Sequence, residues 1–493
     1  MSVLIVASDV KDWPFEIPGV EVVDAWTYLT SPEFASASRN ARVVNLCRSY
    51  RYQSTGYYVS LLAEARGHKP LPGVITLQDL KTRASVKVLS DELDELIQQN
   101  LNLLQSNEFT LSVYFGRNMA RRYDRLALHL FNLFAAPLLR FEFGRNDDGQ
   151  WQIRKVQTVA AHTLPDSHKP FVEESAQRYF SGRASSPRSK KRTRFDLAIL
   201  HDPDEKQNSP SNELALKRFI KAAKEQDIYA ELITKDDYGR LLEFDSLFIR
   251  ETTFVNHHTY RFARRAAKEG MVVIDDPVSI LRCTNKVYLA EMLARHKIDI
   301  PRSIVVHREN IHRIVEELGF PCVLKKPDSA FSKGVVKIAS EEELRERIAD
   351  FLGDSELLIA QEFLPTTFDW RIGILDQKPL FACRYFMAPG HWQIVKQEVA
   401  GRGRYGKTET LPVELAPRKA VKLALKAANL IGDGLYGVDV KESNGNFYII
   451  EVNDNPNIDA GVEDAFLKGE LYTRIMDVFL ERIEQTKAGK RIP

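Results

Sequence analysis

Gly437-Val438-Asp439-Val440, followed by Tyr448-Ile449-Ile450-Glu451-Val452-Asn453-Asp454-Asn455-Pro456, alternates apolar and polar residues with a period of two. Turn-forming residues, Ser443-Asn444-Gly445-Asn446, separate the two halves. The stretch therefore predicts a β-hairpin. Its polar positions carry the oxygen-bearing side chains of Asp439, Glu451 and Asn453, where a buried strand usually carries aliphatic residues.

The register of this hairpin decides whether its two carboxylates meet. A three-residue loop at 444–446 would set Asp439 opposite Glu451, whereas a two-residue loop would put them on opposite faces. Two facing carboxylates inside a sheet repel each other unless a cation lies between them. Hard oxygen ligands at this spacing suit Mg²⁺ carried in on nucleotide phosphates, so we predict the three-residue loop.

The composition is that of an ordinary globular chain with two or three domains. It has 493 residues, of which 44% are hydrophobic and 28% charged, and a net charge of +2. Such a small charge gives no case for nucleic acid or membrane binding, and no stretch approaches the ~20 apolar residues of a membrane span. The four cysteines lie far apart in sequence, which favours free, buried thiols in a reducing cytoplasm over a disulfide or zinc role.

Residues 1–181 predict an N-terminal α/β domain. Residues 4–6 and 42–47 have the pattern of strands, and 57–66, 90–104 and 121–134 that of amphipathic helices. Residues 48–58, between a strand and a helix, could bind an anion through backbone N–H groups with Arg48 and Arg51 nearby. The plainer alternative is an N-capped helix with surface arginines. Residues 182–194 hold six basic residues and no acidic one, which predicts a solvated basic linker rather than an RNA contact.

Residues 195–278 alternate strands and helices, which predicts a small parallel sheet. The strands are expected at 195–200, 228–233, 246–250 and 271–274, and the helices at 212–226 and 257–269. Arg250 falls at the C-terminal end of its strand, where open α/β sheets place ligands. It could hold a substrate carboxylate or form a surface pair with Glu251. The adjacent His257 and His258 are interpreted as structural.

From residue 279 to about 487 the chain carries cations first and acidic residues last. A helix at 286–295 precedes a strand at 321–327 that ends in Lys325 and Lys326, and a loop at 328–338 leads to the next strand. Backbone amides of such a loop can cover phosphates. An apolar strand at 357–364 with a polar end follows. Further cations come next in sequence: Arg371, Arg384, Lys396, Arg402 and Arg404. Cations followed by acidic metal ligands indicate a site for a Mg²⁺-nucleotide.

In this order the motifs resemble an ATP-grasp ligase of the RimK-like branch over residues 279–465. The matching pieces are Thr284-Asn285-Lys286, Val323-Leu324-Lys325, Gly334-Val335, Gln361-Glu362-Phe363-Leu364, Asp369-Trp370-Arg371, Gly437-Val438-Asp439-Val440 and Glu451-Val452-Asn453-Asp454-Asn455-Pro456. The resemblance implies a multidomain α/β and α+β fold: an N-terminal α/β domain, a parallel-sheet pre-ATP-grasp domain and a two-lobed ATP-grasp unit.

The resemblance also implies roles for single residues. Lys286 and Lys325 would contact the α- and β-phosphates, with Lys333 and Gly334 in the loop that covers them. Gln361, Glu362, Phe363 and Leu364 would hold the adenine edge. Arg371 and Arg384 would be catalytic, facing the γ-phosphate and the acyl phosphate. Asp439, Glu451 and Asn453 would bind two Mg²⁺ ions, for which Mn²⁺ is an alternative. Ala330, Phe331 and Ser332 replace common glycines, so Lys325 and Lys326 both stay candidates, and the spacing favours Lys325.

The implied activity is ATP-dependent ligation of a carboxylate to an amine through an acyl phosphate. Its substrates would be amino acids such as glutamate, or peptides. The resemblance also favours a cytoplasmic homo-oligomer, dimer or tetramer. Two other functions stay open: a non-catalytic nucleotide sensor or RNA- or ribosome-associated regulator, and a kinase that has no amine acceptor.

Overall fold

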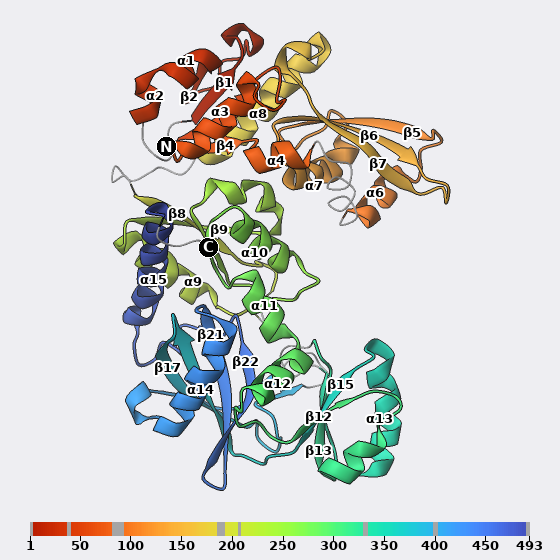
Figure 1. Cartoon of the computed structure of the whole chain (residues 1–493), viewed down its shortest axis with the longest axis vertical. Coiled ribbons are helices and arrows are strands. Elements are labelled where there is room, and N and C mark those ends of the chain that lie inside the picture. The colour runs from red at the N-terminus through yellow and green to blue at the C-terminus, as the bar shows by residue number, and fades with distance from the viewer. Residues whose placement is uncertain are drawn as a thin grey trace. The chain divides into compact units, whose positions relative to one another are not determined.

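The computed structural model describes residues 3–36, 41–80, 93–184, 193–205, 209–328, 334–397 and 403–489 (Figure 1). The chain divides into two compact units. The first comprises Met1–Lys191 and Asp236–Glu243, and the second Arg192–Lys235 and Phe244–Pro493. Residues 236–243 thus group with the first unit, although the strand–helix pattern assigned them to the parallel-sheet domain.

The first unit is an α/β fold built on a parallel sheet in the order β2-β1-β3-β4. These strands are Val20–Asp24, Val3–Ala7, Arg42–Leu46 and Lys69–Leu71. Four helices accompany them: α1 (Ala25–Thr30), α2 (Pro32–Ser36), α3 (Thr55–Ala65) and α4 (Val74–Asp79). The predicted strands at 4–6 and 42–47 and the predicted helix at 57–66 are confirmed.

A second, antiparallel sheet completes the first unit. It consists of β5 (Glu108–Tyr114), β6 (Leu138–Arg145) and β7 (Trp151–Thr158), with helices α6 (Asp94–Leu101), α7 (Asp124–Phe134) and α8 (Lys169–Ala184). The predicted helix at 121–134 begins as a 3₁₀ turn before α7. Helix α8 extends three residues into the predicted basic linker. Most of the linker, 185–192, lies outside the described residues.

The turn between β3 and α3 is an N-capped helix start. The Ser54 hydroxyl accepts a hydrogen bond from the Tyr57 N–H at 3.4 Å. Arg48 is bound to Asp12 through two contacts of 2.8 and 2.6 Å. Because its guanidinium is engaged by a carboxylate, the structure favours the plainer of the two interpretations of 48–58.

The second unit begins with the predicted parallel sheet, in the order β11-β10-β8-β9. Its strands are Val272–Ile274, Ser246–Ile249, Phe195–Leu200 and Ile228–Ile233. Helices α9 (Glu213–Glu225), α10 (His258–Lys268) and α11 (Pro277–Thr284) belong to it. Helices α9 and α10 begin and end within two residues of their predicted bounds, and α11 lies in the stretch that links to the next lobe.

Two antiparallel lobes follow helix α12 (Lys286–Arg295). The first lobe has the strand order β12-β15-β13-β14, with Ser303–Val306, Leu358–Glu362, Cys322–Lys325 and Val335–Ile338, and helix α13 (Glu341–Asp354). The second has the order β20-β17-β16-β21-β22, with Thr408–Leu411, Lys378–Phe386, Phe368–Leu375, Leu435–Ser443 and Asn446–Asn453. Short strands β18 (Val395–Gln397) and β19 (Gly403–Tyr405) and helices α14 (Arg418–Ile431) and α15 (Gly469–Lys487) complete it.

The hairpin β21–β22 brings Asp439 opposite Glu451 by a different route from the predicted one. Its loop has two residues, Asn444 and Gly445, with φ values of 52° and 74°, so the three-residue loop is wrong. Positive φ at both positions is what a tight Asn-Gly hairpin turn requires. A β-bulge between Asp439 and Val440 then adds one residue to β22, and Asp439 pairs with Glu451. A two-residue loop alone would put the two carboxylates on opposite faces of the hairpin. The extra residue of the bulge brings Glu451 back to the face of Asp439.

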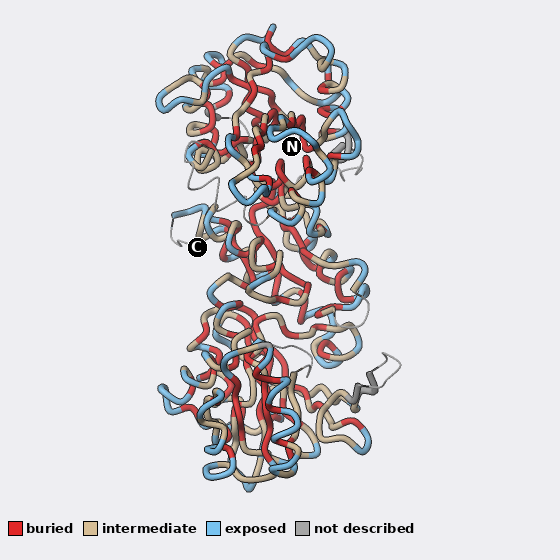
Figure 2. Tube along the Cα trace, turned by 90° about the vertical axis from the view of Figure 1, so that its right-hand side faces the viewer, coloured by how far each residue is buried: buried red, intermediate tan, exposed pale blue. Residues whose placement is uncertain are grey.

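The five-stranded sheet has one apolar and one polar face. Trp370, Ile372, Val438 and Val440 pack with the alanines of α14, namely Ala420, Ala424, Ala427 and Ala428. Side chains alternate along a strand, so Arg371 and Asp439 lie on the other face. Figure 2 shows that the buried trace follows the strands, whereas exposed residues lie on loops and outer helix turns.

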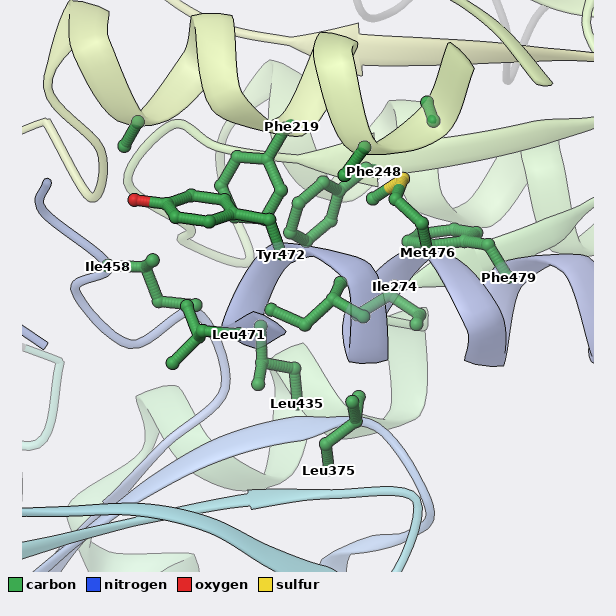
Figure 3. Packing of buried hydrophobic residues seen from close by; sticks show 14 of the residues in the cluster. Phe219, Phe248, Ile274, Leu375, Leu435, Ile458, Leu471, Tyr472, Met476 and Phe479 are labelled. Atoms are coloured by element: carbon green, nitrogen blue, oxygen red, sulfur yellow. The ribbon is translucent and has the colours of Figure 1, made fainter. Parts of the chain in front are cut away.

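Helix α15 packs against α9 of the parallel-sheet domain and near the strands of the second lobe (Figure 3). Phe219, Phe248, Tyr472 and Phe479 form edge-to-face pairs with centroid distances of 4.7–5.3 Å. Leu375 and Leu435 join this core from β16 and β21. The C-terminal helix therefore fixes the second lobe to the parallel-sheet domain.

Two further expectations can be compared with the structure. All four cysteines are free and buried, which confirms the predicted state of the thiols. Over the described ranges, no helix combines the length and the apolar character needed to cross a membrane.

We predict that Phe479→Ala lowers the free energy of unfolding by about 3–5 kcal/mol, because it opens a cavity between α15 and the parallel sheet. The matched control is Phe466→Ala, whose side chain is 52% exposed and should change stability by at most ~0.5 kcal/mol. Urea unfolding followed by tryptophan fluorescence measures both. Equal effects of the two substitutions would contradict the role of this core.

Candidate functional site

A row of charged side chains crosses the polar face of the second lobe. Arg371 on β16 lies opposite Asp439 on β21, which lies opposite Glu451 on β22. The Arg371 guanidinium donates two hydrogen bonds of 2.7 Å to the two carboxylate oxygens of Asp439. Glu451 pairs at 3.1 Å with the ammonium of Lys286, the first residue of α12. Each carboxylate of the facing pair thus has its own cation.

A second ion pair lies one step along the strands. Lys441 on β21 donates hydrogen bonds of 2.6 Å to Asp369 and to Thr366, and Thr366 in turn donates to Asp369 at 2.9 Å. Asp369 and Lys441 both line the same cleft as the charged row. The alternation of β16 therefore places Asp369 and Arg371, two residues apart, on one functional face.

Lys325 is the inward-pointing member of the lysine pair. Its side chain is buried and lines the cleft, whereas the Lys326 ammonium lies 5.1 Å from the ring centroid of Phe351. Successive residues at a strand end point to opposite faces, so only one of the two can reach the cleft. The choice that sequence spacing favoured, Lys325, agrees with this geometry.

Burial and local charges shift the pKa values of several groups in the cleft. Burial raises the pKa of Asp439, although its ion pair with Arg371 opposes the rise. Burial lowers the pKa of Lys325 to about 8, and the nearby ammonium groups of Lys286 and Lys441 add to the effect, while Glu451 opposes it. Burial alone would raise the pKa of Glu451, but the ammonium groups of Lys286 and Lys325 hold it below its usual range. Glu451 is therefore an ionised carboxylate at neutral pH, as a metal ligand must be.

The end of strand β15 forms an aromatic wall of the cleft. Gln361, Glu362, Phe363 and Leu364 all line it. The Glu362 carboxylate bonds Arg302 at 2.8 and 2.9 Å, and Gln361 donates to the Ser303 hydroxyl at 2.8 Å. The Phe363 ring lies 5.8 Å from that of Trp392. The two rings stand edge to face, and aromatic rings beside polar side chains suit a purine base.

These elements enclose a cleft of about 760 Å³, within the usual range for small-molecule sites. Both lobes contribute to its walls, together with the start of α12, the parallel-sheet domain at 252–254 and the loop 454–463. The structure thus brings together most of the predicted site residues: Lys286, Lys325, Gln361, Glu362, Phe363, Leu364, Arg371, Asp439, Glu451 and Asn453. Gly334 immediately precedes β14, next to the lining residue Val335, and Lys333 lies outside the described residues.

Arg384 is not brought to this cleft, which corrects its expected place beside the γ-phosphate. It lies opposite Trp370, a residue of the apolar face that α14 covers. Its guanidinium carbon is 4.8 Å from the Trp370 ring centroid and 5.2 Å from that of Phe368. The residue on the polar face of β17 is its neighbour Tyr385. The order of motifs predicted that Arg384 lies in the cleft. The register of β16 and β17 instead places Tyr385 on the face that lines the cleft.

Arg250 is neither a substrate ligand nor a surface ion pair. It is fully buried and donates to the Ser211 hydroxyl and to the oxygens of Pro210, Asn455 and Pro456, at 2.5–3.0 Å. Burial lowers its pKa to about 10. Arg250 therefore holds the loop that follows strand β22.

Glu251 pairs with His258 at 2.5 Å, and the His257 ring bonds the Thr259 hydroxyl at 3.0 Å. These contacts agree with a structural role for the two histidines. They also account for the Glu251 carboxylate, which the sequence had offered as a surface partner of Arg250.

The donor set fits a hard divalent cation. Asp439 and Glu451 face each other, and Asn453 donates through its amide nitrogen to the Gly437 carbonyl at 3.3 Å, so its amide oxygen is the candidate ligand atom. Three oxygen donors and no thiolate or imidazole favour Mg²⁺ over softer metals.

Sequence reasoning missed several lining residues, among them Tyr385, Trp392, Lys441 and Glu463. Lys441 could have been found, because it follows Asp439 by two residues and therefore shares its face. Tyr385 required the register between β16 and β17, and Glu463 lies in a loop without a periodic pattern.

Two parts of the chain match known families. Residues 25–175 match the RimK-like ATP-grasp N-terminal domain, and residues 283–468 match the RimK-like ATP-grasp domain. A probable alpha-L-glutamate ligase of Vibrio vulnificus is 24% identical over 46% of this chain and 73% of its own length. The alpha-aminoadipate–LysW ligase LysX of Sulfolobus acidocaldarius is 27% identical over 47% of this chain and 82% of its own length.

Among solved structures, the D-alanine–D-alanine ligase of Bacillus anthracis aligns over 60% of this chain and all of its own, with 16% identity and a TM-score of 0.46. The two family matches together span more than half of the chain, and the second contains the charged row, Lys325 and the end of β15. The chain belongs to the RimK-like ATP-grasp family of ligases.

Proposed function

We propose that this protein joins a carboxylate to an amine through an acyl phosphate made with ATP, and that one substrate is an amino acid such as glutamate. The observation that carries the proposal is the convergence of Lys286, Lys325 and Arg371 with Asp439, Glu451 and Asn453 in one cleft. The names of the glutamate ligase relatives support the choice of amino acid.

The ion pairs of the row suit the binding of a Mg²⁺-nucleotide. Lys286 and Arg371 are each held by a carboxylate, Glu451 and Asp439 respectively. Both cations can turn to phosphate oxygens if the carboxylates turn to metal ions, so no charge is left unpaired in either state. Asp439, Glu451 and Asn453 would hold two Mg²⁺ ions. Bound Mg²⁺ would neutralise the charge on the phosphates and on the transferred group.

The remaining residues position ATP and its reacting end. Lys325 and Lys286 would contact the α- and β-phosphates, and the end of β15 would hold the adenine. Lys333 and Gly334 are further proposed nucleotide-binding residues. Arg371, on the polar face, would stabilise the charge on the transferred phosphoryl group.

The chemistry needs two steps. A carboxylate oxygen of the substrate attacks the γ-phosphorus and ADP leaves, which gives the acyl phosphate. An amine then attacks the acyl carbon and phosphate leaves. The attacking groups both belong to the substrates, so no side-chain nucleophile is needed. The four cysteines agree with this, because burial raises the pKa of each thiol.

Glu451→Ala is expected to lower the rate of ATP-dependent amide formation by ~10² to 10³, because it removes a metal ligand and leaves Lys286 without its carboxylate. Glu442→Ala, an exposed glutamate on the neighbouring strand β21, is the matched control and should leave the rate unchanged. Coupled ADP release and mass spectrometry of the amide measure the effect. Full activity of Glu451→Ala with an intact fold would refute the assignment.

Lys325→Ala should weaken Mg²⁺-ATP binding by about 1.5–3 kcal/mol, because a charge-assisted contact to phosphate is lost. Lys326→Ala, a change of the adjacent residue that lies over Phe351, should leave the affinity unchanged. Isothermal titration with a non-hydrolysable ATP analogue compares the two. A loss of affinity in Lys326→Ala alone would reverse the assignment of the pair.

The activity itself is tested by ADP release over a panel of amino-acid pairs that includes L-glutamate. Substrate-stimulated ADP release and an amide product are expected for at least one pair. ADP that depends on a carboxylate but yields no amide would favour a kinase. Nucleotide binding without stimulated ADP release for any pair would favour a sensor.

A further inference from the structure

A tyrosine–glutamate pair stands in the cleft beside the charged row. Tyr385 on β17 donates its hydroxyl to an oxygen of Glu463, which belongs to the loop before α15. Both residues line the cleft, although Tyr385 is only 8% and Glu463 only 2% exposed. Tyr385 lies opposite Asp369, and the Arg371 guanidinium carbon is 5.0 Å from its ring centroid. The pair is thus next to the residues assigned to the reacting phosphate.

We propose that Tyr385 and Glu463 accept the proton that the amine substrate must lose before it attacks the acyl phosphate. This inference rests on the proposed ligase function and names the group that completes its second step. Tyr385 would touch the amine, and Glu463 would receive the proton through the tyrosine hydroxyl.

The need for a proton acceptor follows from the charge of amines near neutral pH. An amino acid carries its amine as an ammonium group, which has no lone pair and cannot attack carbon. Binding alone does not remove this proton. Within the described lining of the cleft, the lysines and Arg371 are poor acceptors, and the proposal assigns Asp439 and Glu451 to metal ions. Glu362 and Asp369 are paired with Arg302 and Lys441, and Asp454 and Asp459 accept hydrogen bonds from the Thr253 hydroxyl and the Asn212 N–H. Glu463 is the lining carboxylate that Tyr385 connects to the position of Arg371.

The proposed step balances in atoms and charge. One ammonium proton moves to the Tyr385 hydroxyl oxygen, while the tyrosine's own proton moves to Glu463. The nitrogen lone pair forms the C–N bond, and the C–O bond to phosphate breaks with its electron pair. A second nitrogen proton leaves on the departing phosphate, and the amide nitrogen keeps the third. The products are the amide, inorganic phosphate and a neutral Glu463.

The surroundings of Glu463 suit a proton acceptor. Burial raises the pKa of its carboxyl to about 7, so it is much closer in proton affinity to an amine than an exposed glutamate is. One carboxylate oxygen accepts from the Asp459 N–H at 2.7 Å, which leaves the other for Tyr385. The charged and titratable groups around the pair include Arg371 and Asp369 on β16, Cys383 on β17, Asp459 on the loop, and Arg250 after β10.

The plainer interpretation is that this hydrogen bond merely fastens the loop 454–463 to β17. Both interpretations predict lower stability when the bond is removed. They differ in the reaction step that is affected, because a loosened loop would impair every acceptor alike. A proton acceptor matters only for amines that arrive protonated.

The experiment compares two acceptors in the full-length protein. Hydroxylamine is neutral near pH 7 and attacks an acyl phosphate without a base, whereas the second acceptor is an amino acid that supports ADP release by the wild type. L-glutamate and the other common amino acids serve as carboxylate donors. The variants are Tyr385→Phe and Glu463→Gln, which keep the ring and the side-chain shape. Tyr436→Phe is the control, because it removes a buried hydroxyl that bonds Ser279 away from the described lining of the cleft.

We expect Tyr385→Phe and Glu463→Gln to slow amide formation by ~10² to 10⁴ at pH 7 and to leave hydroxamate formation at the wild-type rate. Tyr436→Phe should retain both reactions. Wild-type amide formation should fall as the pH drops below about 7, because Glu463 is then protonated and cannot accept a proton, and hydroxamate formation should lack this fall.

Two results would overturn the inference while leaving the ligase function intact. One is equal loss of amide and hydroxamate formation in the variants, which would mean a structural role. The other is wild-type amide formation in both variants. A wild-type protein that forms neither product from any donor would instead overturn the ligase function, and the inference with it.

Discussion

The facing carboxylates of Asp439 and Glu451 are the constraint around which the second lobe is arranged. Two like charges on adjacent buried strands can persist only if cations compensate them. The structure supplies Arg371 from the neighbouring strand and Lys286 from the start of α12. Both cations come from elements outside the hairpin. The charged row therefore ties three strands and a helix to one electrostatic requirement.

The same requirement divides the sheet into two chemically different faces. Because side chains alternate, the face opposite the charged row must bury its apolar residues, and the alanine-rich side of α14 allows close packing there. The position of Arg384 follows from this division, because its guanidinium lies over the rings of Trp370 and Phe368 and does not enter the cleft. The alternation that brings Tyr385 to the polar face takes its neighbour away from it.

Supports outside the charged row hold the cleft in shape. Arg250 fixes the loop after β22 through the oxygens of Asn455 and Pro456, and the core around Phe479 holds α15 against the parallel sheet. In the sequence, Glu463 lies between Pro456 and Phe479. Its carboxylate accepts hydrogen bonds from the Tyr385 hydroxyl and the Asp459 N–H. Burial that stabilises the loop also raises the pKa of this glutamate, so packing and acid–base chemistry are linked at one residue.

The sequence by itself determined the hairpin that carries Asp439 and Glu451 and the parallel sheet at 195–278, because the alternation of apolar and polar residues is a local property. It did not predict the antiparallel sheet of β5, β6 and β7. The roles of the site residues came from the resemblance of the sequence motifs to RimK-like ligases. The resemblance named Lys286, Lys325, Arg371, Asp439, Glu451 and Asn453, which all line one cleft. Tertiary structure decided what depends on register and distant partners. The Asp439–Glu451 pairing depends on a bulge that compensates for a two-residue turn. The register between β16 and β17 places Tyr385, not Arg384, on the face that lines the cleft. The sequence predicted Arg250 to be a substrate ligand or a surface residue. Instead it is buried and donates hydrogen bonds to acceptors about 40 and 205 residues away in the chain, which no local sequence pattern indicates.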